Sequence, residues 1–490
     1  MLRRSLYGWM FVLGLALPVL AQEGFPLFTT DFPPEEFAAR RAKVYEAIGV
    51  DAFAVLQGAP SPPGYTRFRQ TNDFYYLCGI EVPHAYLLLD GAAKKATLLL
   101  PPRNEGRERG EGKMLSAEDA EEVKKLSGVE AVASTDVLAE QIEGRFLRAG
   151  KRVLYTPLAP AEGGSMSRDL ALRFTADAAA DPFDGQPSRE GNFVRLVKER
   201  FPFFEIRDLS PTLDVLRLIK SERELAVIRK TTKLAGLAIL EGMRSTRPGQ
   251  YEHELDAVGK FVFYRNGAQG DAYFSLIGSG RNAYWPHYNA GKRKMEDGDF
   301  LLFDYAPDWG YYESDVTRMF PVNGKFSQWQ RELYGFYLAC YRAILKAIRP
   351  GLTAQEVMQA AGKDMQGILA ASKFSKDTHR KGAEKFVADY NTAASKEETA
   401  HLGHWVGMAT HDDGPHTGPL KAGMVFTIEP ALTVPEEKIY VRLEDMIFIN
   451  DQAAEVVSTD APWDIDAIEK AMKEEGMLER YPRVYPPPGK

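Results

Sequence analysis

The chain has 490 residues, of which 44% are hydrophobic and 26% are charged, and its formal net charge at pH 7 is −7. This length allows two or three domains with large cores, and the composition is that of a soluble globular protein. Because the net charge is negative, the sequence gives no reason to expect nucleic acid or another polyanion as a partner.

The first 21 residues are typical of a cleaved signal peptide. Two arginines near the start precede an uncharged apolar stretch, residues 9–20, and Ala21 follows it. A basic start, a short apolar core and a small final residue are the parts of such a signal. A membrane anchor is the alternative, but Gly14 and Pro18 interrupt a stretch that is already shorter than the roughly 20 residues of a membrane span. We therefore expect no stable membrane span, cleavage near Ala21, and export to a periplasm or the extracellular space.

Short apolar segments alternate with helical patterns between about residues 34 and 204. Segments such as 52–56 and 96–100 are bounded by Gly, Pro or Asp, as buried strands are. This alternation predicts an α/β domain, to which we assign residues 22–207. Within it, Arg67–Gly79 (RFRQTNDFYYLCG) is predicted to be a core strand with a polar start.

From residue 208 onward, long amphipathic helices alternate with short strands. Periodicity predicts helices over residues 222–243, 251–264, 327–348, 353–371 and 467–478. We assign a second, α+β domain to residues 208–470. Residues 471–490 are assigned to the end of the last helix and a Pro-rich tail, of which residues 481–490 are expected to be loosely packed. The charged segment Lys373–Thr399 is open to three interpretations: a solvated helix, an irregular insertion or a lid.

Two carboxylates lie in one predicted β-hairpin, residues 299–321. An apolar strand ends at Asp304, and a second strand-like run, residues 311–320, carries Asp315. A carboxylate that ends a buried strand is costly unless a cation neutralises it, so the pair indicates a cation site. The alternative is that Asp304 starts a turn while Asp315 forms a surface ion pair with Arg318.

The same arrangement occurs a second time along the chain. Gly298–Asp304 reads GDFLLFD and Gly423–Pro430 reads GMVFTIEP, so in both segments a glycine precedes an acid at the end of an apolar strand. The first is followed by the strand that carries Asp315, and the second by one that carries Glu444. We interpret this as an internal duplication with pseudo-two-fold symmetry, which would place four carboxylates around one point. Strand alternation puts Arg442 on the same face as Glu444.

A histidine completes this set of groups. For a lone histidine a structural role is the usual one, but four acids without a nitrogen donor favour His404 as a ligand. His411 and His416 follow in the same block, and His287 follows a Gly-rich turn. Four carboxylates and one imidazole suit two divalent ions such as Mn²⁺, Co²⁺ or Zn²⁺. Two such ions about 3.5 Å apart can hold a hydroxide that attacks an amide carbonyl.

Five motifs occur in order along the chain. They are RQTNDFYYLCG (69–79), SDVTRMFPVNGKF (314–326), HWVGMATHD (404–412), GMVFTIEP (423–430) and RLED (442–445). Together they resemble the pita-bread metallopeptidase family, and within it the aminopeptidase P branch. The resemblance covers nearly the whole chain after residue 21. It implies an α/β N-terminal domain followed by an α+β pita-bread catalytic domain.

The resemblance also implies a role for each candidate residue. The metal ligands would be Asp304, Asp315, His404, Glu429 and Glu444, with Asp315 and Glu444 bridging two ions. Glu429 would also shuttle protons, and Arg442 would hold the substrate or orient Glu444. His287 and His411 would contact the substrate and stabilise the tetrahedral intermediate. The implied reaction releases the first residue of a peptide with proline second, and we expect a homo-oligomer, either a dimer or a tetramer.

Three departures from the family pattern lie around the substrate pocket rather than among the ligands. Tyr305-Ala306 replaces the usual Ala-Gly after Asp304, and Thr433 stands where the family has a tyrosine. The family often has a histidine four residues before the ligand histidine, whereas here His401 lies three residues before it. These changes bear on substrate choice and rate more than on metal binding.

Two alternatives to an Xaa-Pro aminopeptidase remain at this stage. An Xaa-Pro dipeptidase shares the catalytic motifs and differs in the length of peptide that it cleaves. A catalytically inactive, peptide-binding homologue typically loses metal ligands, whereas all five ligand positions are filled here.

Overall fold

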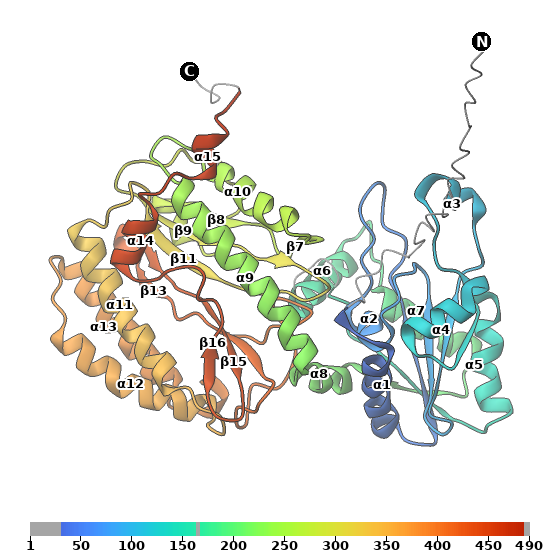
Figure 1. Ribbon diagram of the computed structural model, residues 1–490. Coiled ribbons are helices and arrows are strands. Elements are labelled where there is room, and N and C mark those ends of the chain that lie inside the picture. Colours follow the sequence, from blue (N-terminus) through green and yellow to red (C-terminus); the bar gives the residue numbers. More distant parts are fainter. Residues whose placement is uncertain (1–30, 163–166, 485–490) are drawn as a thin grey trace, which may run out of the picture.

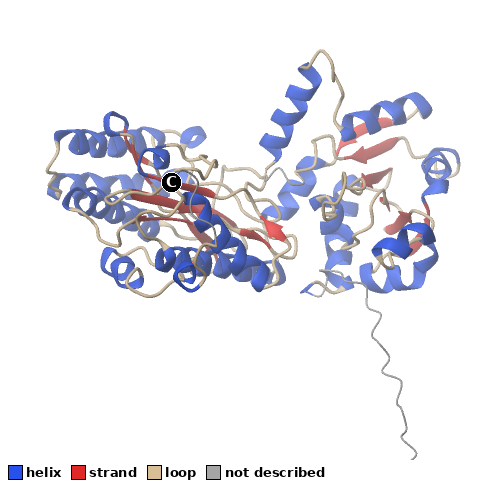
Figure 2. Ribbon diagram, turned by 90° about the horizontal axis from the view of Figure 1, so that it is seen from above, coloured by secondary structure: helices blue, strands red, loops and turns tan. Residues whose placement is uncertain are grey.

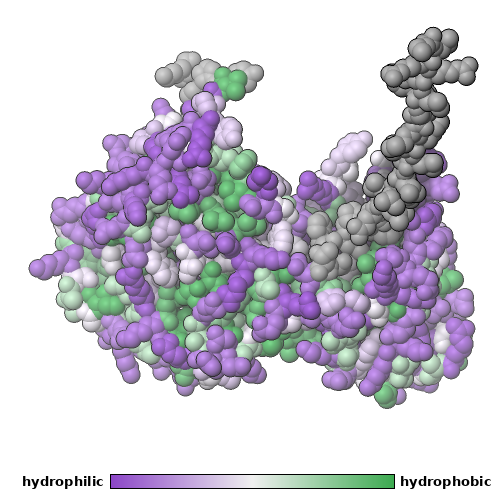
Figure 3. Space-filling view, in the orientation of Figure 1, coloured by the Kyte–Doolittle hydropathy of each residue, from purple (hydrophilic) through white to green (hydrophobic). Residues whose placement is uncertain are grey.

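The computed structural model describes residues 31–162 and 167–484, which form two lobes joined near residue 209 (Figure 1). The predicted signal peptide, residues 1–21, lies outside the described residues. Within the described ranges, no helix combines the length and the apolar character that crossing a bilayer requires. On the face shown in Figure 3, hydrophilic residues dominate both lobes, and hydrophobic residues are scattered among them.

The N-terminal lobe is built on a six-stranded sheet with the order β4-β3-β2-β1-β5-β6. β1 pairs antiparallel with β2 and parallel with β5, so the sheet is mixed. Its strands are β1 (Ala52–Gln57), β2 (Tyr86–Asp90), β3 (Lys95–Leu100), β4 (Ala131–Ser134), β5 (Val153–Thr156) and β6 (Glu205–Asp208). Its helices are α1 (Pro34–Ile48), α2 (Asn72–Cys78), α3 (Glu105–Glu111), α4 (Ala120–Ser127), α5 (Leu138–Leu147), α6 (Arg168–Ala180) and α7 (Arg189–Arg200). The predicted α/β character of this lobe is confirmed.

The segment predicted to be a core strand, within Arg67–Gly79, is instead helical. All residues of α2 except Asp73 are buried. Gly79 ends the helix in the left-handed conformation, with φ of 66°, and its N–H donates to the carbonyl oxygen of Tyr75 at 2.7 Å. A short run that is buried on all sides carries no periodicity to separate a helix from a strand, and the strand prediction was therefore wrong.

The C-terminal lobe contains two three-stranded sheets, with the orders β11-β9-β8 and β12-β15-β16. In each sheet a strand followed or ended by an acid, β9 or β12, pairs antiparallel with a later strand, β11 or β15. The sheets meet where the backbone N–H groups of Thr317 and Glu444 donate to each other's carbonyl oxygens, at 3.3 and 3.1 Å. The strands are β7 (Gly270–Asp271), β8 (Leu276–Ser279), β9 (Phe300–Asp304), β10 (Pro307–Asp308), β11 (Thr317–Pro321), β12 (Val425–Ile428), β13 (Leu432–Val434), β14 (Ile439–Val441), β15 (Asp445–Ile449) and β16 (Ala454–Val456). The predicted α+β domain with an internal repeat is confirmed.

Figure 2 shows the strands of this lobe between layers of helices. The helices are α8 (Ser210–Leu218), α9 (Glu222–Ser245), α10 (Glu252–Arg265), α11 (Gln328–Ala347), α12 (Ala354–Ala371), α13 (Asp377–Ala393), α14 (Ile465–Ala471) and α15 (Met477–Arg480). Capping boxes start three of them, from Ser221 and Glu224 at α9, from Ser327 and Gln330 at α11, and from Thr353 and Glu356 at α12. Such boxes satisfy backbone N–H groups that the first turn leaves free, which fixes where these helices begin.

Two segments differ from what the sequence predicts or leaves open. Most of Lys373–Thr399 is the amphipathic helix α13, which packs its apolar face on β13, where Gly382 approaches the backbone of Thr433. The single final helix predicted over 467–478 is two short helices, α14 and α15. Gly476 lies between them, and a Cβ atom there would come within 2.4 Å of the Ser245 backbone, so a glycine is needed where the chain passes this close to α9.

Candidate metal centre

The four predicted acids all lie at strand ends beside the junction of the two sheets. Asp304 is the last residue of β9, and Glu429 directly follows β12. Asp315 lies just before β11, and Glu444 directly precedes β15. Because Thr317 pairs with both Asp304 and Glu444, the two sheets bring the carboxylates to one place.

The first hairpin differs in detail from the prediction. The second strand begins only at Thr317, because Gly310 and Tyr311 both have positive φ, at 64° and 70°, which bends the chain before it. The surface ion pair between Asp315 and Arg318 is absent among the described residues. Arg318 is fully buried and bonds to Asp445 at 2.6 Å, whereas Asp315 faces His404.

The five predicted metal ligands fall into overlapping groups. Asp304, Asp315 and Glu444 offer ligand atoms within 4.8 Å of one another, and so do His404, Glu429 and Glu444. Glu444 therefore belongs to both groups. Carboxylate oxygens with one imidazole nitrogen form a donor set that fits divalent cations such as Mn²⁺, Co²⁺ or Zn²⁺.

Two buried polar atoms of the cluster have no hydrogen-bond partner among the described residues, His404 Nε2 and Glu444 Oε1. His404 Nδ1 lies 3.1 Å from the carbonyl oxygen of Trp405, so Nδ1 carries the donated proton and Nε2 faces the acids. Nε2 is 3.4 Å from Glu429, 3.5 Å from Asp315 and 3.7 Å from Glu444. Lone pairs that face each other at this range need a cation or a proton between them, so the geometry fits a metal ion.

The electrostatics of the cluster give the same indication. Burial raises the pKa of Asp304 to about 6 although the guanidinium of Arg442 opposes the shift. Burial and the Asp304 carboxylate raise the pKa of Asp315 to about 6. Burial also raises the pKa of Glu429 and of Glu444, each with help from a neighbouring carboxylate. The protein's own positive groups thus do not balance the buried negative charge.

Arg442 and two hydroxyl groups contact the acids. The guanidinium of Arg442 donates to Asp304 and, at 3.0 Å, to Glu429. Tyr273 places its hydroxyl oxygen 2.6 Å from both Asp304 and Asp315, and the Thr317 hydroxyl donates to Glu444 at 2.7 Å. Sequence reasoning found Arg442 but missed Tyr273 and Thr317, since neither lies at a spacing that marks it as part of the site.

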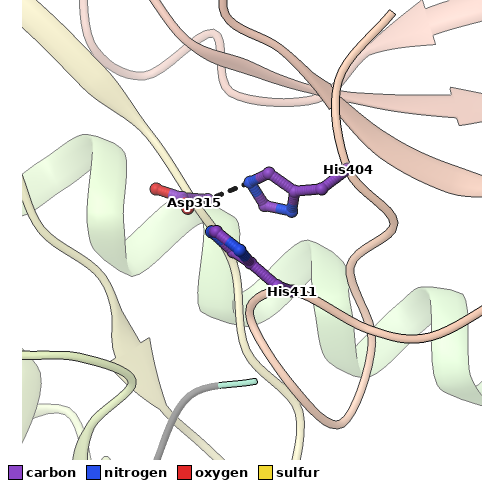
Figure 4. A group of neighbouring side chains, drawn as sticks. All are labelled: Asp315, His404 and His411. Carbon is purple, nitrogen blue, oxygen red and sulfur yellow. Dashed lines mark ion pairs between the residues drawn. The ribbon is translucent and has the colours of Figure 1, made fainter. Parts of the chain in front are cut away.

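The two predicted substrate-binding histidines lie at different places around the cluster. The ring of His411 lies against that of His404, with centroids 3.9 Å apart, and Figure 4 shows both rings beside Asp315. Burial and His404 lower the pKa of His411 to about 3, so the ring is neutral. His287 lies in an exposed turn, and partial desolvation of its ring, together with the nearby charge of Arg442, lowers its pKa.

A cavity of about 560 Å³ opens onto the cluster. Its lining includes His401, His404, His411 and Glu429. Phe386, Asp389, Tyr390 and Ala393 of α13 also line it, together with residues of α11 and α12. The charged segment whose place the sequence left open therefore forms a wall of the candidate active site.

Tyr305, which departs from the family pattern next to the first ligand, points into the core of the lobe. Its side chain is fully buried and its ring packs on Phe263, with centroids 5.0 Å apart. A Cβ atom at Gly259 would lie 2.7 Å from the Tyr305 ring, so the glycine leaves room for the tyrosine. Tyr305 acts in packing.

Both lobes match known protein families. The sequence model of metallopeptidase family M24 matches residues 226–451, and that of the aminopeptidase P N-terminal domain matches residues 37–155. The chain is 29% identical over 465 residues to the Xaa-Pro aminopeptidase of Escherichia coli, covering 90% of this chain and 99% of that protein. It is 26% identical over 464 residues to the Xaa-Pro aminopeptidase of Haemophilus influenzae, covering 91% and 99%.

Solved structures show the same similarity. Aminopeptidase P from E. coli with the inhibitor Pro-Leu matches with a TM-score of 0.71 and 27% identity, over 90% of this chain and 98% of that chain. A zinc-substituted form of the E. coli enzyme in complex with product matches with a TM-score of 0.71 and 26% identity, over the same shares of 90% and 98%. Both lobes are therefore covered together by single known proteins.

Proposed function

Because the chain belongs to metallopeptidase family M24 and to its aminopeptidase P branch, we propose that it is a dinuclear metallo-aminopeptidase that releases the N-terminal residue from peptides with proline second. The observation that carries the proposal is the convergence of Asp304, Asp315, His404, Glu429 and Glu444 at the junction of the two sheets. Both matched relatives are named Xaa-Pro aminopeptidases, which supports the substrate class.

These five residues would hold two divalent ions, and the family resemblance implies that Asp315 and Glu444 would contribute to both. Mn²⁺ is our first choice, with Co²⁺ and Zn²⁺ as alternatives, because carboxylates outnumber the single imidazole. When bound, such ions polarise the scissile carbonyl and supply a water nucleophile at neutral pH.

The chain's own residues would do the remaining work. The side chain of Glu429 is 26% exposed, against 3% for Asp304 and 1% for Glu444, so it is the carboxylate placed to exchange protons with a substrate. His411 lines the cavity, and an N–H of its neutral ring would stabilise the negative charge that develops on the carbonyl oxygen. Arg442 fixes the carboxylates of Asp304 and Glu429 relative to each other.

An Xaa-Pro dipeptidase is the second candidate, and it uses the same centre. The matched N-terminal domain of aminopeptidase P favours the aminopeptidase. The test is to load the purified protein with Mn²⁺ and compare cleavage of Gly-Pro with that of Gly-Pro-Leu and longer Xaa-Pro peptides. We expect the longer peptides to be cleaved with the higher kcat/KM. Cleavage of dipeptides alone would show the second candidate to be correct, and no cleavage of either would support an inactive binding homologue.

Export and self-association belong to the same proposal. Residues 1–21 have the composition of a cleaved signal, and a homo-oligomer is expected from the family resemblance. N-terminal sequencing of the protein recovered from the cell envelope or the medium should begin after Ala21. Light scattering of that material should give a mass of two or four chains. A retained N-terminus or a monomer would remove the corresponding part of the proposal.

A further inference from the structure

The loop that carries His404 and His411 is held largely by groups outside its own sheet. We call residues 404–413 the histidine loop. The two ends of the loop are joined by a hydrogen bond: the N–H of Asp412 donates to the carbonyl oxygen of Trp405 at 2.8 Å. The N–H of Val406 bonds to Val425 of β12 at 3.1 Å. The N–H of Thr427, also in β12, donates to the carbonyl oxygen of His404 at 3.0 Å. The remaining contacts considered below come from outside this sheet.

The start of α2, in the N-terminal lobe, contacts the middle of the histidine loop. The side-chain amide of Asn72 donates to the carbonyl oxygen of Met408 at 2.9 Å, and Arg69 reaches the same oxygen at 3.4 Å. Arg69 also donates to Asn72 Oδ1 at 2.6 Å. Asn72 is 1% exposed, so its amide meets the loop away from water. These residues belong to the RQTND motif, which has no part in the metal centre.

One arginine joins the end of the histidine loop to the same helix. Arg217 of α8 donates to the carboxylate of Asp412 at 2.5 Å and to that of Asp73 at 2.9 Å. It also donates to the carboxylate of Glu162 at 3.0 Å, and the arginine is only 2% exposed. A Cβ atom at Gly407 would lie 2.1 Å from Asp412 Oδ2, so a glycine in the loop leaves room for this carboxylate.

The His411 ring depends on this support for its place. Within residues 31–162 and 167–484, no hydrogen bond fixes the ring, and its close contact is the ring of His404. Its backbone forms a bridge with Ser167, directly before α6, and Arg168 of that helix pairs with Asp413 at 3.1 Å. Figure 1 places α6 and α8 at the junction of the two lobes. Several of the residues that fix the position of His411 relative to the metal centre therefore belong to the N-terminal lobe.

We propose that Asn72 and Asp73 are positioning residues that hold the histidine loop, and through it His411, against the metal centre. The proposal rests on the proposed function, in which His411 contacts the substrate. The N-terminal lobe is then part of the catalytic machinery rather than a separate binding module. A displacement of about 1 Å at a group that contacts the reacting atoms lowers the rate by roughly 10²-fold.

A double-mutant cycle between Asn72 and His411 tests this coupling. Asn72→Asp keeps the size and the acceptor for Arg69 but turns an oxygen toward the Met408 carbonyl and toward the Glu162 carboxylate, which the amide contacts at 3.3 Å. We expect kcat for an Xaa-Pro tripeptide to fall about 10- to 100-fold with the metal content unchanged. In the His411→Ala background the same change should cost less than about threefold, because its effect passes through the missing ring. An equal loss in both backgrounds, or no loss in either, would overturn the proposal.

Two further variants separate a positioning effect on kcat from a general loss of stability. Asp73→Asn leaves Arg217 bonded to Asp412 and Glu162 and should lower kcat in the same direction by a smaller factor. Asp90→Asn is the matched control, since Asp90 is a buried acid of the same lobe, 5% exposed and paired with Arg145 at 2.6 Å and Lys151 at 3.1 Å. The control should lose stability while kcat stays at the wild-type value. A fall of kcat in the control as large as that in Asn72→Asp would reduce the effect to stability alone.

Hydrogen exchange tests the same proposal without any substrate. The amides of Asp412 and Val406 should exchange faster in Asn72→Asp than in the wild type, and at the wild-type rate in Asp90→Asn. Unchanged exchange in Asn72→Asp would overturn the positioning role whatever reaction the protein catalyses. A wild-type protein that cleaves no Xaa-Pro peptide would instead defeat the proposed function and leave the exchange result to decide this inference.

Discussion

Two clusters of buried charge lie side by side along the same strands of the C-terminal lobe, and they differ in completeness. At one, Arg318 and Asp445 are both fully buried, and every N–H of the guanidinium has an acceptor. Tyr341 and Ser458 donate to the Asp445 carboxylate. At the other, four carboxylates face one arginine and one histidine. Three buried atoms there have no hydrogen-bond partner among the described residues: His404 Nε2, Glu444 Oε1 and Arg442 Nε.

The difference separates a structural cluster from a binding site. Buried charges that satisfy one another need nothing from solution, whereas an excess of buried carboxylates is stable only if a cation joins them. Arg318 lies three residues after Asp315, and Asp445 directly follows Glu444. Position along the chain alone therefore does not distinguish the two clusters. The two clusters are distinguished by whether every buried donor, acceptor and charge has a partner.

The largest effect should come from removing a shared ligand. Asp315→Asn takes away a charge proposed to bridge both ions, so we expect kcat/KM to fall at least about 10³-fold, equivalent to roughly 4 kcal/mol. The measurement is steady-state cleavage of an Xaa-Pro tripeptide with Mn²⁺ in excess. Activity close to that of the wild type would mean that Asp315 is no ligand.

Glu429→Gln separates proton transfer from metal binding. The amide keeps a ligand oxygen but cannot accept a proton, so we expect turnover to fall about 10²- to 10⁴-fold while metal is still bound. Turnover and metal content should be measured on the same sample. Loss of metal in parallel with turnover would leave Glu429 as a ligand only.

Much of the site could be predicted from the sequence, because the acids repeat at matching places after two apolar strands. The structure brings three residues of separate motifs together, since Arg442 donates to both Asp304 and Glu429. Sequence reasoning could not find Tyr273, because a hydroxyl that bonds to Asp304 across 31 positions leaves no local pattern.

The fold was predictable to a similar extent. Long helices with capping boxes, such as α9 and α12, were found near their observed ends. The helix α2 was not, because its residues are buried on every side. The role of Asn72 also escaped prediction, since its contact with Met408 joins residues 336 positions apart.

Breaking the complete cluster of Arg318 and Asp445 should lower the stability of the protein and leave its metal binding unchanged. Arg318→Met leaves Asp445 buried without its partner, so we expect the free energy of unfolding to fall by about 3 to 5 kcal/mol. Adding Asp445→Asn should recover part of this loss. Chemical denaturation of the metal-free proteins measures both effects, and metal content of the folded variant should stay at the wild-type level. A stability unchanged by Arg318→Met would contradict the comparison.

The smallest effect concerns pH in the metal-free protein. The pKa of Asp315 is raised to about 6 in the folded state. On acidification, this carboxylate therefore binds a proton at a higher pH in the folded protein than in the unfolded chain. Asp315→Asn should therefore stabilise the metal-free protein at pH 7.5, by at most about 3 kcal/mol. This advantage should shrink as the pH falls through about 6 toward about 4. An advantage that grows on acidification would have the wrong sign for an uncompensated carboxylate.

The most direct test of the central claim is metal content after equilibrium dialysis against Mn²⁺, measured by plasma mass spectrometry. The account predicts about two ions per wild-type chain, a clear loss in Asp315→Asn, and no loss in Arg318→Met. Uptake of less than one ion by the wild type, or equal uptake by the wild type and Asp315→Asn, would contradict the account.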